Sequence, residues 1–506
     1  MRRGIALLCA AAALGAAALL ERGTRACRPA MQSGMERQRG DSLPPAVQLA
    51  STLLGSFRAL LVDYLWIHAE TLQNEGRFFA AAEAARWITM LQSRVEGSWS
   101  FQAWNLGVNV PSSLPPEERW PYVRAAVELL WRDGLAANPR SLGLHWEIAW
   151  FWAYKIDGEI DATGPQYRTE VESAGREILG AEPWDPAAFA AAEALLPALR
   201  RDPAVARFAE TLAALGVGDV EGGWTALWAA PEAVLGDAAD ALAAALREDP
   251  LLEAYDRGLR ARAWRRTFGV GMDVVAKAHG RFGDVGLLRP ESFVLFWARH
   301  GLEQLAPDAV RLDAIALWRM ELRALTRLFQ SGEIALLAAI DREYAEAAAR
   351  AAGDSYHRKQ EASFLEDRIQ FLKGAIPLAY ISGTRRGREL AEEHFAKLAE
   401  LDPAGTPRVA CEDYVYDWIY RKVNVERATR DELLAVIRAF LREALRAAAR
   451  GEDDGARTYL DFARGLYGEA AAVFTGPEFP SFDRVAAQAR RELAPARGGR
   501  AKGRAG

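Results

Sequence analysis

The feature that most constrains the fold is a recurring pair of residues, an aspartate or asparagine followed by proline. It lies between stretches rich in alanine and leucine and occurs at Asn138-Pro139, Asp185-Pro186, Asp202-Pro203, Asp249-Pro250 and Asp402-Pro403. An Asx side chain accepts hydrogen bonds from the unpaired N–H groups that start a helix, and proline at the first helical position sacrifices no hydrogen bond. Each pair therefore predicts that one helix has ended and another begins. Because the segments between the pairs hardly alternate with a period of two, the sequence predicts an all-α fold.

The composition is that of a folded protein without nucleic-acid-binding character. Of the 506 residues, 50% are apolar and 26% are charged, with a net charge of −5. A chain of this length holds two or three domains or one extended array. No domain stands out as basic, so we expect no nucleic-acid partner. The six histidines are scattered, and HExxH, CxxC and GxSxG motifs are absent from the sequence, which predicts neither a metal nor a cofactor.

The N-terminus predicts a membrane segment. Arg2 and Arg3 precede an uncharged stretch at residues 4–20, which is short for a transmembrane helix and long for the core of a signal peptide. We favour an uncleaved anchor within residues 1–28, passing once through the inner membrane with the body in the periplasm. A cleaved signal peptide and a cytosolic helix are the alternatives. Residues 29–45 are polar, contain Gly and Pro, and indicate a tether.

A helix–turn–helix cadence follows the tether. Apolar residues spaced alternately by four and three predict one face of a long helix, at Leu53, Phe57, Leu60, Tyr64 and Ile67. Gly76 ends this helix, because glycine readily takes the left-handed conformation at a helix C-terminus. A second helix then carries Phe78, Ala81, Ile88 and Leu91. The aromatic ring would fill the gap between the two helices, and the alanine would let their backbones approach.

This cadence resembles the tetratricopeptide repeat, a helix–turn–helix unit whose pairs stack into a superhelix. Two further matches are Ala391, Phe395, Leu398, Leu401, Asp402 and Pro403, and then Gly451, Ala456, Leu460 and Ala463. The helix before the last match opens with Thr429 and Glu432 at capping-box spacing. The resemblance implies a right-handed helical-repeat solenoid, in one array or two lobes. Residues 60–152 are also similar to bacterial membrane-anchored repeat proteins of unresolved role, which implies an anchor and a scaffold.

Changes of composition along the chain divide it into six segments. They are an anchor or signal segment at 1–28, a polar tether at 29–45, a tryptophan-rich helical-repeat lobe at 46–163, an alanine-rich region of less regular helices at 164–290, a C-terminal helical-repeat lobe at 291–480 and a basic tail at 481–506. We expect the tail to be disordered beyond its first residues.

Tryptophan is unusually frequent, with 16 residues against 13 tyrosines. Large rings can fill a core built from many alanines, and a subset can line a groove that binds a partner's apolar side chains or stacks on sugar rings. The predicted groove residues are Trp104, Asn105, Asn109, Trp146 and Trp152. Trp104 is the preferred member, because polar amides beside an aromatic ring suit recognition.

A second resemblance concerns Glu291-Ser292-Phe293, which is followed by Gly301, Leu302, Glu303 and Gln304. It is similar to the soluble lytic transglycosylases, which combine an alanine-rich helical superhelix with a catalytic Glu-Ser pair and a Gly-Leu-x-Gln stretch. That resemblance implies an acid role for Glu291. The simpler interpretation of Glu291 is a first-turn acid at a helix N-terminus.

The sequence therefore predicts a non-enzymatic, membrane-tethered helical-repeat scaffold that mediates a protein–protein interaction in the cell envelope. The alternative is an envelope enzyme or glycan-binding protein, similar to the lytic transglycosylases, that uses the tryptophan-rich lobe.

Overall fold

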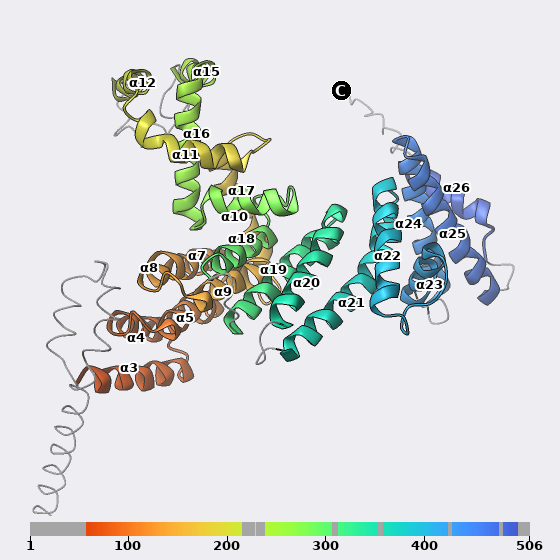
Figure 1. The fold of residues 1–506 in the computed structure, drawn as a ribbon, viewed down its shortest axis with the longest axis horizontal. Helices are drawn as coiled ribbons and strands as arrows, with labels where there is room; N and C mark the ends of the chain where they lie inside the picture. Colours follow the sequence, from red (N-terminus) through yellow and green to blue (C-terminus); the bar gives the residue numbers. More distant parts are fainter. Residues whose placement is uncertain are drawn as a thin grey trace, which may run out of the picture. The chain divides into compact units, whose positions relative to one another are not determined.

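The computed structural model describes residues 57–214, 228, 238–305, 312–352, 358–423, 428–474 and 479–493, and these residues form helices and turns without a β-strand. The all-α prediction is confirmed for this part of the chain (Figure 1). The chain divides into two compact units, Met1–Arg94 and Val95–Gly506. The predicted anchor at 1–28 and tether at 29–45 lie outside the described residues. None of the described helices is long and apolar enough to cross a membrane.

The first unit contains a helical hairpin, α3 (Phe57–Asn74) and α4 (Phe78–Leu91). Gly76 lies between the helices with φ +72°, the left-handed conformation that the sequence predicts. The two helices pack together, and Ala81 is fully buried, as expected where two helix backbones approach closely.

The described members of the predicted apolar stripe do not lie on the buried face of α3, and Leu53 lies outside the described residues. Leu60, Tyr64 and Ile67 are 60–66% exposed, whereas Val62 and Leu72 are buried. Apolar residues at steps of three and four occur on two faces of α3, so spacing alone does not distinguish the face that packs on α4.

The second unit begins with short helices interrupted by three π-helical segments, in which each turn is wider than an α-helical turn. In order they are α5 (Glu96–Trp104), η1 (Asn105–Asn109, π), α6 (Val110–Ser112), η2 (Pro116–Glu118, 3₁₀), α7 (Trp120–Leu129), η3 (Leu130–Gly134, π), α8 (Leu135–Ala137), α9 (Leu142–Trp150) and η4 (Phe151–Ile156, π).

Longer helices follow. They are α10 (Gly164–Leu179), α11 (Pro186–Leu199), α12 (Pro203–Ala214), α15 (Ala239–Glu248), α16 (Pro250–Phe268), α17 (Met272–Phe282), α18 (Pro290–Leu302), α19 (Leu312–Gln330), η6 (Ile334–Leu336, 3₁₀), α20 (Leu337–Ala352), α21 (Arg358–Ile381), α22 (Arg385–Leu401), α23 (Cys411–Val423), α24 (Arg430–Ala449), α25 (Asp453–Val473) and α26 (Phe482–Leu493).

Three of the five Asx-Pro pairs start helices as predicted. Asp185 accepts hydrogen bonds from the backbone N–H groups of Ala187 and Ala188 at the start of α11. Asp202 and Asp249 accept comparable bonds of 2.8 and 2.9 Å at the starts of α12 and α16.

The prediction is wrong for the other two pairs, which end helices without starting the next. Asn138 donates its side-chain amide to the carbonyl oxygen of Gly134 at 3.2 Å, and Ser141 caps α9 instead. Asp402 ends α22 and accepts a bond from Gly405 N–H in a turn. An Asx side chain also stabilises turns, so the residue pair alone does not distinguish the two uses.

The capping box at Thr429 and Glu432 is confirmed. The Thr429 side chain accepts from the Glu432 N–H at 3.3 Å, and the Glu432 carboxylate accepts from the Thr429 N–H at 2.8 Å. Gly451 has φ +76° between α24 and α25, and Ala463 on α25 is fully buried. The helical hairpin that the sequence predicts here is therefore present.

Packing within the second unit follows two patterns. Helices near the C-terminus pair mostly with their sequence neighbours: α20 with α21, α21 with α22, and α24 with α25. In contrast, α9 packs against α18 and α19, and α11 against α16 and α17, which come much later in the chain. The second pattern departs from a solenoid, in which each unit contacts only its neighbours. It creates the groove described below.

The last described helix, α26, occupies the first part of the predicted basic tail. Val485 and Ala489 on this helix are buried, and the helix packs against α24. Residues 494–506 lie outside the described part of the chain.

Candidate functional site

A groove with a volume of about 630 Å³ lies beside α9, η4 and α19, with α20 and α21 contributing to its lining. Trp146 from α9 and Tyr154 from η4 line it, together with Arg319, Arg323 and Arg327 from α19. Four other hollows on the described part of the second unit are smaller, with volumes of about 10 to 260 Å³. Its aromatic and cationic lining makes it the candidate functional site.

Three aromatic rings form a continuous strip that leads into the groove. The Trp104 ring contacts Trp150 with a centroid distance of 5.0 Å, and Trp150 contacts Tyr154 at 5.4 Å. Trp146, Trp150 and Tyr154 recur every four residues, so they follow one side of the helix that α9 and η4 form together. Trp104 is 39% exposed, which places its ring at the protein surface. We call Trp104, Trp150 and Tyr154 the aromatic strip.

Three arginines form a matching row on α19. Arg319, Arg323 and Arg327 are also four residues apart and line the same groove. The guanidinium carbon of Arg323 lies 4.5 Å from the ring centroid of Tyr154, and that of Arg319 lies 5.4 Å from the ring of Phe364 on α21. Both distances suit cation–π attraction. We call these three residues the arginine ladder.

The members of the arginine ladder differ in how their charges are compensated. Arg327 forms an ion pair with Asp157 at 2.6 Å, and Arg323 forms one with Glu159. Arg319 instead donates to two neutral groups of α21, the Gln360 amide oxygen at 3.2 Å and the Ser363 hydroxyl at 2.9 Å. Within the described chain, Arg319 has no carboxylate in ion-pair contact.

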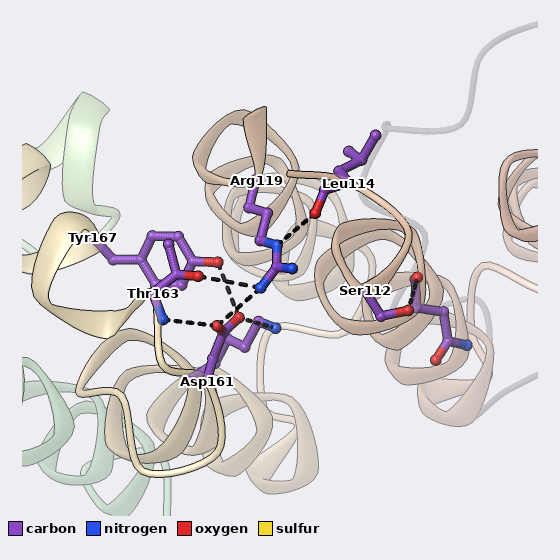
Figure 2. Close-up of polar contacts among 8 residues, drawn as sticks. Ser112, Leu114, Arg119, Asp161, Thr163 and Tyr167 are labelled. Atoms are coloured by element: carbon purple, nitrogen blue, oxygen red, sulfur yellow. Dashed lines mark hydrogen bonds and ion pairs between the residues drawn. The ribbon is translucent and has the colours of Figure 1, made fainter. Parts of the chain in front are cut away.

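The two acids that compensate the ladder, Asp157 and Glu159, lie in the connection at residues 157–163. A buried cluster centred on Asp161 holds this connection (Figure 2). The Asp161 carboxylate pairs with Lys155 Nζ at 2.6 Å and with Arg119 Nη1 at 3.3 Å. It also accepts hydrogen bonds from the Thr163 backbone N–H at 2.9 Å and the Tyr167 hydroxyl at 3.0 Å. Lys155 lies on η4, Thr163 directly precedes α10 and Tyr167 lies on α10, so the cluster fixes both ends of the connection at 157–163. Arg119, between η2 and α7, ties this connection to an earlier part of the chain.

The protonation states in this cluster suit a structural role. Burial alone would raise the pKa of Asp161, but its hydrogen bonds with Lys155 and Thr163 outweigh that effect and hold the pKa at about 2. Burial and the adjacent carboxylate raise the pKa of Tyr167, so its hydroxyl remains a hydrogen-bond donor. A carboxylate that is fully paired in this way orients the chain around it.

The structure brings some of the predicted groove residues together and separates others. Trp146 lines the groove, and Trp104 lies at the far end of the aromatic strip. Trp152 is only 3% exposed and stacks on Phe293 at 4.0 Å, so its ring fills the core.

The two predicted asparagines lie in the π-helical segment η1. Asn105 is fully buried, donates to the Phe101 carbonyl oxygen at 3.0 Å and accepts from the Asn109 side chain at 2.8 Å. Asn109 is half-buried. Both side chains therefore hydrogen-bond within their own helix, which favours a structural role in the wide turn.

Sequence reasoning missed Trp150, Tyr154 and the arginine ladder. The spacing of the three arginines, every four residues on α19, indicates that they share one face of the helix. Its aromatic counterpart lies more than 160 residues earlier in the chain, and no local pattern indicates that the two rows share a groove.

Glu291, the acid implied by the second resemblance, lies in the first turn of α18. It lines a hollow of about 10 Å³ together with Asp157, Arg323 and Arg327. That space suits about one water molecule and excludes a sugar ring. The placement matches the simpler interpretation of Glu291 as a first-turn acid.

The histidines provide one contacting pair, a buried His145 and a half-buried His300, rather than a cluster of ligands. His145 on α9 is 1% exposed, its Nδ1 lies 2.6 Å from the Ser141 carbonyl oxygen, and its ring lies 5.2 Å from that of His300. Burial lowers the pKa of His145 to about 4 and also lowers the pKa of His300. Among the described residues, no group of three or more His, Cys, Asp or Glu side chains is placed to hold a metal ion.

Comparison with known proteins gives no relative from which a function could be transferred: no family model, curated protein or solved structure matches this chain.

Proposed function

We propose that this protein is a non-enzymatic helical scaffold whose groove binds a segment of a partner protein. In this proposal residues 1–28 tether it to the inner membrane, with the body in the periplasm. The observation that carries the proposal is that the aromatic strip meets the arginine ladder at the groove, where Arg323 lies over the ring of Tyr154. Tryptophan, tyrosine and arginine are the side chains most enriched at the energetic centres of protein interfaces.

The pairing of helices supports a scaffold with two parts. We propose that α20 to α25 continue as a right-handed array similar to tetratricopeptide repeats, because most of these helices pair with their sequence neighbours. Packing of α9 against α18 and α19 ties the start of the second unit to the two helices that precede this array. The groove lies beside that junction, where side chains from distant segments face one ligand.

Glycan binding is the second candidate, and the aromatic strip is the observation that favours it. Exposed rings in a row can stack on successive sugars. The arginine ladder gives no advantage with a neutral glycan, which is why we rank a protein partner first. Sedimentation of the purified protein with peptidoglycan, compared with the Trp104→Ala variant, distinguishes the two candidates.

Trp104→Ala tests the proposed interface, and Trp152→Ala is its matched control. A photo-reactive residue placed at Trp146 in cells would first cross-link the partner, which is then purified. Loss of the partly exposed Trp104 ring should weaken binding by about 2 kcal/mol, roughly thirtyfold in Kd, with a much smaller loss of stability than Trp152→Ala. Loss of the buried Trp152 ring should reduce stability by about 3–5 kcal/mol.

Two results would count against the interface. One is a Trp104→Ala variant that binds the partner with wild-type affinity. The other is a loss of stability in Trp104→Ala as large as in Trp152→Ala, because the ring would then contribute to the core.

A further inference from the structure

We propose that the partner segment bound in this groove carries a carboxylate that pairs with Arg319, next to an aromatic or aliphatic side chain that packs on the groove walls. This inference rests on the proposed function and specifies the chemistry of its ligand. It follows from the uneven compensation of charge along the arginine ladder.

The first step concerns available charge. Arg327 pairs with Asp157, which also pairs with Arg168, and Arg323 pairs with Glu159, so these two ladder guanidinium groups have carboxylate partners before any ligand arrives. Within the described chain, Arg319 donates hydrogen bonds only to neutral oxygens on α21. The end of the groove at Arg319 is therefore where an incoming anion finds a cation without a carboxylate partner.

The second step concerns hydrogen-bond donors. A guanidinium has five N–H donors, and Arg319 uses only Nη2 in its bonds to Gln360 and Ser363. In the described chain, its Nε and Nη1 donors make no hydrogen bond. The Phe364 ring lies 5.4 Å from the guanidinium carbon and limits its motion. A guanidinium held beside a ring, with donors to spare, suits a carboxylate, which accepts two parallel bonds from arginine.

The third step concerns what lies beside Arg319. Trp146, Tyr154 and Phe364 line the same groove and provide an apolar surface for a neighbouring side chain of the ligand. Asp367 also lines the groove and forms no ion pair with another described residue. Its negative charge should weaken the attraction of the groove for a carboxylate. Replacing Asp367 by a neutral residue should therefore change Kd in the opposite direction to replacing Arg319.

The experiment selects ligands from a displayed library of random 15-residue peptides on the full-length protein. We expect the selected peptides to be enriched in Asp or Glu within about four residues of an aromatic or large aliphatic residue, the reach of one helical turn. For the best peptide, Arg319→Gln should raise Kd about tenfold. Asp367→Asn should lower Kd. Arg342→Gln removes an exposed arginine of α20 that does not line the groove, and it should leave Kd unchanged.

A thermodynamic cycle then assigns the contact. Replacing the peptide's acid by its amide should weaken binding to the wild type about tenfold and binding to Arg319→Gln hardly at all. Arg319 is exposed, so this substitution leaves no cavity in the fold.

The possible failures are distinguishable. If selected peptides lose affinity for Tyr154→Ala but show neither acidic enrichment nor dependence on Arg319, the charge inference is overturned and the groove function stands. If no peptide is selected, or if those selected bind Tyr154→Ala as well as the wild type, the groove function fails and the inference fails with it.

Discussion

The charges of the Asp161 cluster predict which of its residues can be replaced with the smaller loss of stability. Two cations, Lys155 and Arg119, face the single carboxylate of Asp161. Asp161→Asn preserves the size of the side chain but leaves both cations without an anion, and Lys155 is only 5% exposed. Lys155→Met leaves one Arg119–Asp161 pair with no net charge. The two substitutions break the same 2.6 Å contact with opposite effects on the balance of charge.

The magnitudes follow from the ionisation of Asp161. A folded-state pKa of about 2 against the ordinary value of 3.8 means that ionisation stabilises the fold by about 2 kcal/mol at neutral pH. The buried cation left unpaired in Asp161→Asn raises the expected loss of unfolding free energy to about 3–5 kcal/mol. Lys155→Met removes a charge-assisted hydrogen bond and should lose at most about 2 kcal/mol.

Urea unfolding at pH 7, followed by far-UV circular dichroism, measures both losses. Because the folded-state pKa of Asp161 is depressed, its contribution is present above about pH 4 and disappears as the pH falls toward 2. The difference between the wild type and Asp161→Asn should therefore shrink over that range. A Lys155→Met variant that is less stable than Asp161→Asn would refute the reasoning from charge balance.

Two further predictions concern stability. Burial holds the pKa of His145 at about 4 against its ordinary 6.5, so the unfolded chain takes up the proton first and unfolding free energy should fall by about 3 kcal/mol as pH drops from 6.5 to 4. His145→Asn should remove this part of the pH dependence of stability, measured by thermal unfolding at each pH. An unchanged pH dependence would contradict the burial argument. Ala81→Leu should overpack the contact between α3 and α4 and reduce the unfolding free energy by about 1–3 kcal/mol. Ala82→Leu, at a half-buried position, should have little effect. Equal melting temperatures for the two variants would argue against the close contact.

Local chemistry explains the part of the fold that could be predicted. Asp185 caps α11 through its own side chain, and Thr429 and Glu432 cap α24 with bonds that span three residues. Gly76 takes a positive φ because the next helix must turn back at once. Each interaction lies within a few residues, so sequence spacing carries the information.

The candidate site could be predicted only in part, because its walls are distant in sequence. Trp146 and Trp104 stood out by residue type alone. Arg319 is a candidate binding residue because of its neighbours on α21 and the nearby aromatic strip. This arrangement depends on how α9 packs against α19. Composition also does not distinguish Trp104 from Trp152, because exposure at the surface and stacking in the core use the same residue type.

The π-helical segments make the length of this region as important as its residue types. A π turn contains about one residue more than an α turn, so everything beyond it is rotated by about 100° relative to an uninterrupted α-helix. Tyr154, which lines the groove, and Lys155, which pairs with Asp161, both lie within η4. Deleting one residue inside η4 should restore a regular α-helix and turn these side chains away from the groove and from Asp161. In this part of the chain, changes in length that a surface loop would tolerate alter the phase of a helix, and with it the groove.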